Sequence, residues 1–234
     1  MKKVFKILSL LLMLLFSTSA FFGCEKPYFV YDEQGLAYHL MGSSYEISLG
    51  DCEEKEIVIP SIFKGKPVST ISVFTGSTLK SVKISKGVEI IEAWAFCDSR
   101  MLVSVELPDG LCKIGIGAFS DCRSLRNIEI PDGIKNIEKG TFSSCEELES
   151  VVLPDSIETI SERAFAHCKS LTYIDLPVSI KEIGRSAFVN CSALTSIYYN
   201  GTVEEWEKIV KGDDWNRGVP ATDVFCIDGN VSLI

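Results

Sequence analysis

A 23-residue period constrains this chain more than any other feature of its sequence. Phenylalanine and leucine both recur at that interval, and aliphatic residues between them keep the same phase. The repeated positions are Phe96, Phe119, Phe142, Phe165 and Phe188, together with Leu79, Leu102, Leu125, Leu148, Leu171 and Leu194. Such regularity predicts a repeat architecture, because chance does not hold two residue types in register over so many copies.

Each 23-residue unit is expected to form one short strand, followed by a segment that brings the chain back to the start of the next strand. Val105-Glu106-Leu107 alternates apolar and polar residues, which is typical of a strand with one buried face. Pro108 follows and has no N–H to donate, so the strand ends there. A 23-residue unit cannot enclose its own Leu, Ile and Phe, whereas units stacked about 4.8 Å apart build a continuous core. We therefore expect an α/β repeat solenoid of 23-residue coils with a parallel strand sheet.

The unit resembles the leucine-rich-repeat class, whose pattern also begins L-x-x-L-x-L. The usual turn asparagine is missing, and the A-F-x-x-C block and the proline after each strand resemble the BspA-like branch of that class, found on bacterial and some protist surfaces. Residues 57–71 are similar to that family's first coil, interrupted by Lys64-Gly65-Lys66-Pro67. The next coil, around Phe74, is three residues shorter than the regular unit, which predicts a distortion.

Segments outside the repeat predict caps, because an open solenoid end exposes apolar side chains. Residues 36–40 and 45–49 alternate around a Gly-Ser-Ser turn and predict an N-terminal hairpin. Thr202 and Glu205 form a capping box that predicts a helix ending at Gly212, and residues 225–229 resemble the family's C-terminal cap. The expected division is an N-terminal linker and cap at 24–56, a leucine-rich repeat solenoid at 57–199 and a C-terminal cap at 200–234. With both caps present, we expect a complete, stand-alone array.

Residues 1–23 predict an export signal of the lipoprotein type. Three lysines in the first six residues precede an apolar run from Leu8 to Phe16, which is too short to span about 30 Å of hydrocarbon. Cleavage after Ala20 and cleavage before Cys24 both fit the sequence. The Gly23-Cys24 pair resembles a bacterial lipoprotein box, in which Cys24 carries the lipid. We expect an extracytoplasmic protein that reaches the membrane only through this anchor.

Composition argues against several functions. The chain has 23 basic and 32 acidic residues and a net charge of -9, which disfavours binding to nucleic acid. It has only two histidines, His39 and His167, and neither belongs to a set at metal-ligand spacing. The sequence holds no recognisable catalytic motif. We therefore predict no enzyme activity, no cofactor and no metal site.

Nine cysteines in an exported protein raise the question of disulfides. Four of them stand three residues after a repeat phenylalanine and predict a ladder of buried thiols, since in-register side chains point the same way. These four are Cys122, Cys145, Cys168 and Cys191. Cys97 and Cys112 do not fall at this repeat position, and the sequence leaves open whether they form a disulfide with each other. Cys52 and Cys226 fall in opposite caps and are not expected to meet.

Strand residues between the buried positions are expected to point outward as a narrow ladder. Glu106 and Glu129 make the ladder acidic in its middle, and Tyr173, Asp175 and Tyr198 make it aromatic towards its C-terminal end. The ladder is either a solvated face or a binding surface, because solenoid sheets present extended faces and tyrosine is favoured in contact hot spots.

Trp94 is a separate candidate. Its phase mates are Gly117, Gly140, Arg163 and Ser186, so the residue is expected to be largely exposed. It is either a contact residue or a cover for the irregular coil at Phe74, and the second interpretation is favoured.

Three functions follow from these features. The resemblance implies an adhesion or protein-binding module that recognises a protein on a host or neighbouring cell through its sheet face, and this is our prediction. The alternative is a surface lipoprotein that captures a glycan, using clustered tyrosine and tryptophan. An enzyme is the third, and the sequence lacks the acid, base or nucleophile set that it requires.

Overall fold

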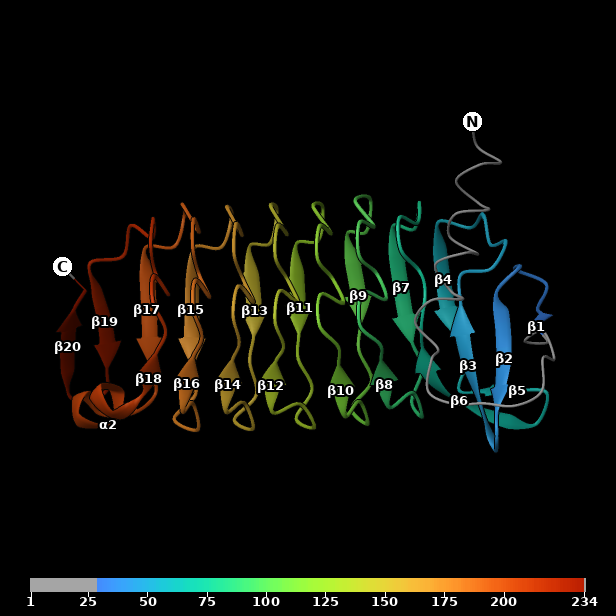
Figure 1. Cartoon of the computed structure of the whole chain (residues 1–234), viewed down its shortest axis with the longest axis horizontal. Coiled ribbons are helices and arrows are strands. Elements are labelled where there is room, and N and C mark those ends of the chain that lie inside the picture. Colours follow the sequence, from blue (N-terminus) through green and yellow to red (C-terminus); the bar gives the residue numbers. More distant parts are fainter. Residues whose placement is uncertain (1–28, 234) are drawn as a thin grey trace.

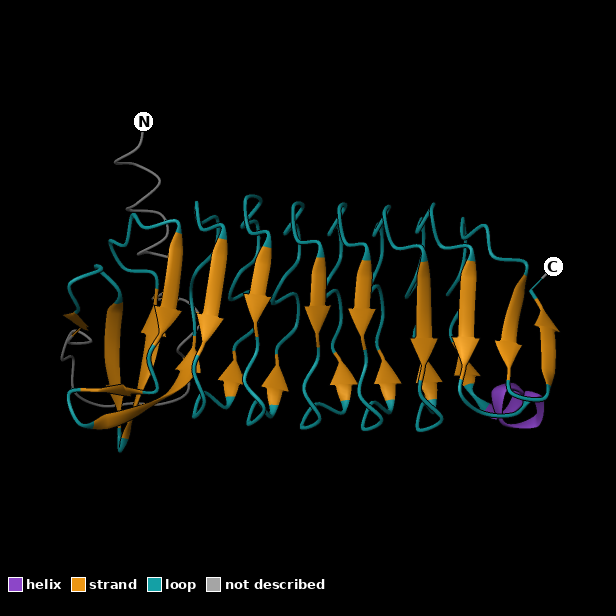
Figure 2. Cartoon of the chain, turned by 180° about the vertical axis from the view of Figure 1, so that it is seen from behind, coloured by secondary structure: helices purple, strands orange, loops and turns teal. Residues whose placement is uncertain are grey.

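Successive coils stack along one axis and form an elongated solenoid (Figure 1). The computed structural model describes residues 29–233, so the predicted signal and Cys24 lie outside the described residues. Each coil runs down a long strand on one side and returns through a short strand and several turns on the other (Figure 2). Among the described residues the helix is confined to α2 (Val203–Lys208), so the coils consist of strands and turns. The predicted repeat solenoid is confirmed.

The long strands are parallel and paired at the expected interval. Val82 pairs with Val105, and Ile128 pairs with Val151. The strands are β4 (Glu56–Ile59), β7 (Ser81–Ile84), β9 (Ser104–Glu106), β11 (Asn127–Glu129), β13 (Ser150–Val152), β15 (Tyr173–Leu176), β17 (Ser196–Tyr199) and β19 (Asp223–Cys226). β20 (Gly229–Ser232) pairs antiparallel with β19 and ends this layer.

The short strands form the second layer, also in parallel pairs. They are β8 (Ile90–Ile91), β10 (Lys113–Ile114), β12 (Asn136–Ile137), β14 (Thr159–Ile160), β16 (Glu182–Ile183) and β18 (Val210–Lys211), and they follow the longer β6 (Lys66–Ile71).

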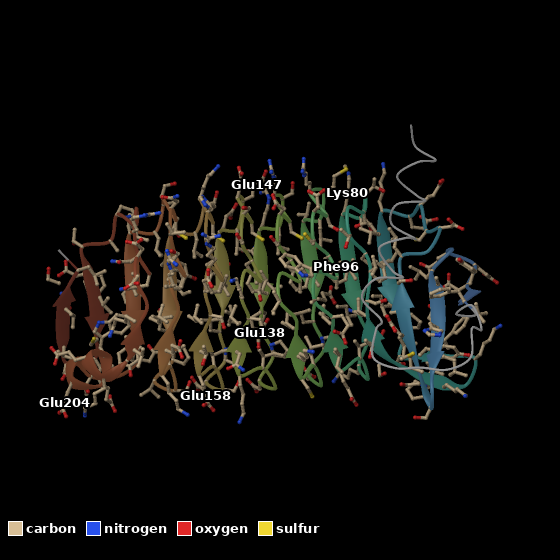
Figure 3. All side chains as sticks on the ribbon, viewed as in Figure 1. Lys80, Phe96, Glu138, Glu147, Glu158 and Glu204 are labelled. Carbon is tan, nitrogen blue, oxygen red and sulfur yellow. The ribbon has the colours of Figure 1, made fainter. Side chains whose placement is uncertain are left out.

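A column of phenylalanine rings fills the space between the two layers. All six rings, from Phe74 to Phe188, are fully buried, and neighbouring centroids lie 5.2 to 5.6 Å apart. Figure 3 shows Phe96 inside the stack, with Glu147 at one edge and Glu158 and Glu204 at the other. Four of the five ring pairs are within 11° of parallel, whereas Phe74 is tilted by 31° against Phe96. The predicted distortion of the short coil is therefore a tilted ring, and Phe74 keeps its place in the core.

The predicted ladder of buried thiols is confirmed. Each ladder thiol donates a hydrogen bond of 3.0 to 3.2 Å to the carbonyl of the repeat phenylalanine in the preceding coil, as Cys145 does to Phe119. Ser99 takes the same position one coil earlier and donates to the carbonyl of Phe74 at 3.0 Å. Every cysteine within residues 29–233 is a free thiol, so the structure contains no bridge between Cys97 and Cys112.

The predicted hairpin lies at the N-terminal end of the array. β2 (Ala37–Met41) and β3 (Ser44–Ser48) pair antiparallel, β1 (Phe29–Tyr31) joins β2, and β3 continues in parallel with β6. The Lys-Gly-Lys-Pro insertion forms a second, shorter hairpin between β5 (Ile62–Phe63) and β6. Phe63 stacks on Tyr38 with centroids 3.7 Å apart, so the insertion packs against the first hairpin.

The predicted start of the C-terminal helix is confirmed and its predicted end is wrong. The Thr202 hydroxyl accepts from the Glu205 N–H at 3.2 Å, and the Glu205 carboxylate accepts from the Thr202 N–H at 2.8 Å. The helix ends at Lys208, because the next residues form β18 and pair with β16. Gly212 has another role: an added Cβ would lie 2.4 Å from the backbone nitrogen of Arg185, so only glycine allows the two coils to approach.

Candidate binding face

The outer surface of the long strands, called here the long-strand face, has the inside-outside alternation predicted from the repeat. Val82, Val105, Ile128, Val151, Ile174 and Ile197 are buried. Two rows of outward residues flank them. The first row contains Ser81, Ser104, Asn127, Ser150, Tyr173 and Ser196, and the second contains Lys83, Glu106, Glu129, Val152, Asp175 and Tyr198.

The acidic part of this face is smaller than the sequence predicts. The Lys83 ammonium pairs with the Glu106 carboxylate across β7 and β9 at 2.5 Å, which offsets part of the charge of Glu106. Both residues border a shallow depression of about 320 Å³ over β4, β7 and β9. Glu129 and Asp175 are exposed, and the ion pairs found among residues 29–233 include neither of them. With Glu56 at the start of β4, they are acidic groups of this face that are open to a partner.

The aromatic part is larger than predicted. β17 pairs with β15 and β19 so that Tyr198 stands between Asp175 and Phe225 in the second row. The rings of Tyr198 and Phe225 are stacked, with centroids 5.4 Å apart. Tyr173 lies on the adjacent strand in the first row, paired with Ser196 and therefore diagonal to Tyr198. The exposed fractions of Tyr173, Tyr198 and Phe225 are 42%, 41% and 37%.

Sequence reasoning missed Phe225 because the interval changes in the last coil. Phe225 follows Tyr198 by 27 residues instead of 23, since α2 is inserted between β17 and β19. The signal in the sequence was the alternation Val224-Phe225-Cys226, which repeats the pattern of the earlier strands.

Trp94 is exposed as predicted, and its ring covers a different coil from the one expected. An added Cβ at Gly117 would lie 2.2 Å from the Trp94 ring, so the ring lies over the glycine of the following coil. The interpretation that it shields the coil at Phe74 is therefore wrong for the ring. The Trp94 backbone contacts that coil through a hydrogen bond of 3.0 Å from the Thr75 hydroxyl to the Trp94 carbonyl. Trp94 belongs to the turn after β8, outside the long-strand face.

Within residues 29–233, no group of three or more His, Cys, Asp and Glu side chains is placed to hold a metal ion. Within the same residues, no helix has the length and hydropathy needed to cross a membrane. What the face offers is a flat surface with aromatic rings and carboxylates on a rigid sheet.

Comparisons with known proteins agree with this architecture. No curated protein matches the chain. A leucine-rich repeat protein of T. pallidum is 30% identical, with a TM-score of 0.70 over 77% of this chain and 85% of that one.

Two longer structures are also similar. A leucine rich cell surface protein from Faecalibacterium prausnitzii is 29% identical, with a TM-score of 0.57 over 76% of this chain and 56% of that one. A leucine-rich repeat protein from Eubacterium ventriosum is 25% identical, with a TM-score of 0.70 over 86% of this chain and 52% of that one. The chain thus spans about half of each of these two proteins.

The family comparison covers most of the repeat array. The family model described as "BspA type Leucine rich repeat region" matches residues 70–195 in six copies, which is more than half of the chain. The matched region contains the phenylalanine column, the thiol ladder and the strands β7 to β15. The chain belongs to the BspA-type leucine-rich repeat family.

Proposed function

We propose that this protein is an extracytoplasmic cell-surface module that binds a protein on a host or neighbouring cell through its long-strand face. Leucine-rich repeat solenoids serve as binding scaffolds, and their sheets present extended surfaces. The structurally similar Faecalibacterium protein is described as a cell surface protein. These two points support a binding role at the surface, and the scaffold gives no reason to assign a catalytic one.

The observation that carries the proposal is the cluster of Tyr173, Tyr198 and Phe225, called here the aromatic cluster. Three partly exposed rings on neighbouring strands are unusual on a face whose other outward positions are mostly serine, asparagine and charged residues. Aromatic rings supply contact area at low entropic cost, and the parallel sheet holds them in place. Asp175 pairs with Tyr198 in the ladder and adds a charge that selects a basic partner group.

The remaining candidates take supporting roles in this proposal. Glu129 lies two coils from Asp175 on the same row and extends the acidic surface. Glu106 contributes less, because Lys83 already pairs with it. Trp94 stands apart from the aromatic cluster and is a contact for a partner that reaches around the turn side.

The test is a pull-down of host and neighbouring-cell surface proteins with the mature chain. Tyr173→Ala with Tyr198→Ala should abolish retention of the bound protein while the melting temperature stays nearly unchanged, because exposed side chains contribute little to stability. Tyr31→Ala is the matched control, since Tyr31 is an equally exposed tyrosine at the other end of the molecule. Equal retention by the double variant and by the control would contradict the proposal.

A second candidate, glycan capture at the same face, is favoured by the grouping of three partly exposed aromatic rings, Tyr173, Tyr198 and Phe225, because sugar rings pack against aromatic side chains. A glycan array separates the two functions. Binding to neutral glycans that is lost in the double variant, without a protein retained in the pull-down, would support glycan capture.

A further inference from the structure

The turns between the short and long strands of the C-terminal coils, outside the long-strand face, carry a polar depression of about 350 Å³. Its lining includes two guanidinium groups, an imidazole, an amide and several hydroxyls, and it includes no carboxylate. The principal residues are Ser144, Arg163, His167, Ser186, Asn190 and Arg217. The acidic neighbours of the two arginines, Glu162 and Asp214, lie beside the depression and outside its lining.

Backbone hydrogen bonds set these side chains in two columns across neighbouring coils. Ser144 N–H donates to Ala166, His167 N–H to Val189 and Asn190 N–H to Arg217, at 2.7 to 2.8 Å. In the second column, the Arg163 N–H donates to the Arg185 carbonyl at 3.0 Å. Because the ladders use these backbone groups, the side chains supply the donors of the depression. Arg163 and Arg217 lie two coils apart and in different columns, so an axial rise of about 10 Å and a lateral offset separate them.

Glycine or asparagine would suit the backbone conformation at Arg163 and His167. Arg163 and His167 have φ values of 56° and 63°, in the left-handed region that favours glycine and asparagine. Glycine fills the phase of Arg163 in two earlier coils, at Gly117 and Gly140. The same two phases have positive φ in the other coils, as at Trp94, Asp121 and Ser186, so this conformation belongs to the repeat and sets the place of the side chains on the turn.

The cations of the depression are free to turn toward a ligand. Arg163 lies 4.0 Å from Glu162 and Arg217 lies 3.3 Å from Asp214, and both arginine side chains are more than 60% exposed. Exposed pairs of this kind are weak. A ligand with its own anionic oxygens can therefore replace Glu162 and Asp214, and the guanidinium fork suits such oxygens.

We propose that this depression binds a sulfated saccharide, with Arg163 and Arg217 on sulfate groups and Ser144, His167 and Asn190 on sugar hydroxyls. Hydroxyls donate and accept hydrogen bonds, as do the serine, asparagine and histidine side chains that line the site. A peptide is a poorer match, because the lining offers neither a strand edge nor an apolar pocket for side chains. This site is independent of the long-strand face and of its partner.

The test is calorimetric titration of the full chain with three probes: a sulfated tetrasaccharide, the same tetrasaccharide without sulfate, and inorganic sulfate. We expect the sulfated tetrasaccharide to bind about tenfold or more tightly than either of the others. Arg163→Gly with Arg217→Gln should weaken that binding by about tenfold or more, as loss of charge-assisted hydrogen bonds does. Glycine is chosen at position 163 because it suits the left-handed backbone there. If the double variant unfolds, the affinity of the Arg217→Gln single variant for the sulfated tetrasaccharide provides the test.

Arg100→Gln with Arg123→Gln is the charge-matched control, since these arginines lie on earlier coils beside Asp98 and Asp121. Its affinity should stay within about twofold of the unmodified chain. The Tyr173→Ala, Tyr198→Ala variant should also bind the tetrasaccharide normally, so that failure of this site and failure of the proposed function are told apart. An equal loss in the charge-matched control would mean non-specific attraction. Equal affinity for inorganic sulfate, or for the tetrasaccharide without sulfate, would overturn the proposal.

Discussion

At the scale of single residues, each buried side chain is stabilised mainly by its counterparts in the two neighbouring coils. Phe142 has a ring 5.6 Å away on one side and 5.4 Å away on the other. The ladder thiols likewise bond to the coil before them, and Ser99 shows that a hydroxyl serves equally well. A change at one position therefore acts on three coils.

Phe142→Ala should lower the free energy of unfolding by about 3 to 5 kcal/mol, because it removes a fully buried ring and leaves a cavity between two others. Denaturant titration measures the loss. Phe225→Ala, which removes a partly exposed ring, is the control and should cost much less. A loss below about 1 kcal/mol for Phe142→Ala would contradict the inside-outside assignment.

The buried thiols predict a dependence of stability on alkaline pH. Burial raises the pKa of Cys122, Cys145 and Cys168 above the ordinary value of 9.0, so the folded chain holds these protons after the unfolded chain begins to release them. Their stabilising effect is complete below pH 9 and is lost as the pH rises beyond it, at up to about 1.4 kcal/mol per pH unit for each thiol.

Urea titrations between pH 8 and pH 10.5 check this expectation. Cys145→Ser with Cys168→Ser should make the decline shallower, because serine keeps the hydrogen bond and does not titrate in this range. Cys112→Ser, at an exposed thiol, should leave the slope unchanged. An identical slope in all three proteins would show that other groups control the alkaline transition.

At the scale of elements, the repeat predicts strands well and the ends of irregular segments poorly. The period places Val105 and Glu106 on opposite faces of β9, and the structure agrees. It does not predict where α2 stops, because that point depends on pairing between β18 and β16 rather than on Gly212. Phe225 was missed for a related reason, since the inserted helix moves it out of phase.

The capping box of α2 gives a prediction at this scale. Thr202→Ala removes the hydroxyl that accepts from the Glu205 N–H, and it should cost about 1 kcal/mol of unfolding free energy. Hydrogen exchange at the Glu205 amide should accelerate at the same time. Thr202→Ser keeps the acceptor and is the conservative control; if it destabilised the protein as much as alanine, the bond would not be the cause.

At the scale of the whole molecule, the sequence predicts the scaffold and leaves the site incomplete. Phase alone shows that Tyr173, Tyr198 and Trp94 are exposed, because exposure depends on the alternation of the strand and on the position in the coil. Phase does not show that the Trp94 ring lies over Gly117, which depends on side-chain torsions and on the absence of a Cβ in the next coil. The division into caps and a solenoid at 57–199 stays a prediction.

Surface attachment also belongs to this scale. Cys24→Ser should release the protein into the medium, because the signal then lacks the thiol that carries the lipid. Fractionation of cells followed by immunodetection measures the release, and Cys112→Ser should stay with the membrane. A Cys24→Ser protein that remained in the membrane fraction, or a mature chain beginning at Phe21, would contradict the anchor.

The in-register stacking of coils of equal length means that one coil can be removed or added as a unit. Unequal recombination between two neighbouring repeats of the gene deletes or duplicates 23 codons, and each junction still joins a strand to the next strand at the same phase. The column of phenylalanine rings then loses or gains one member without a change in its neighbours' contacts. Such events lengthen or shorten the distance between the two ends of the long-strand face in steps of about 4.8 Å. A lineage can thus adjust the reach of this surface without inventing a new residue.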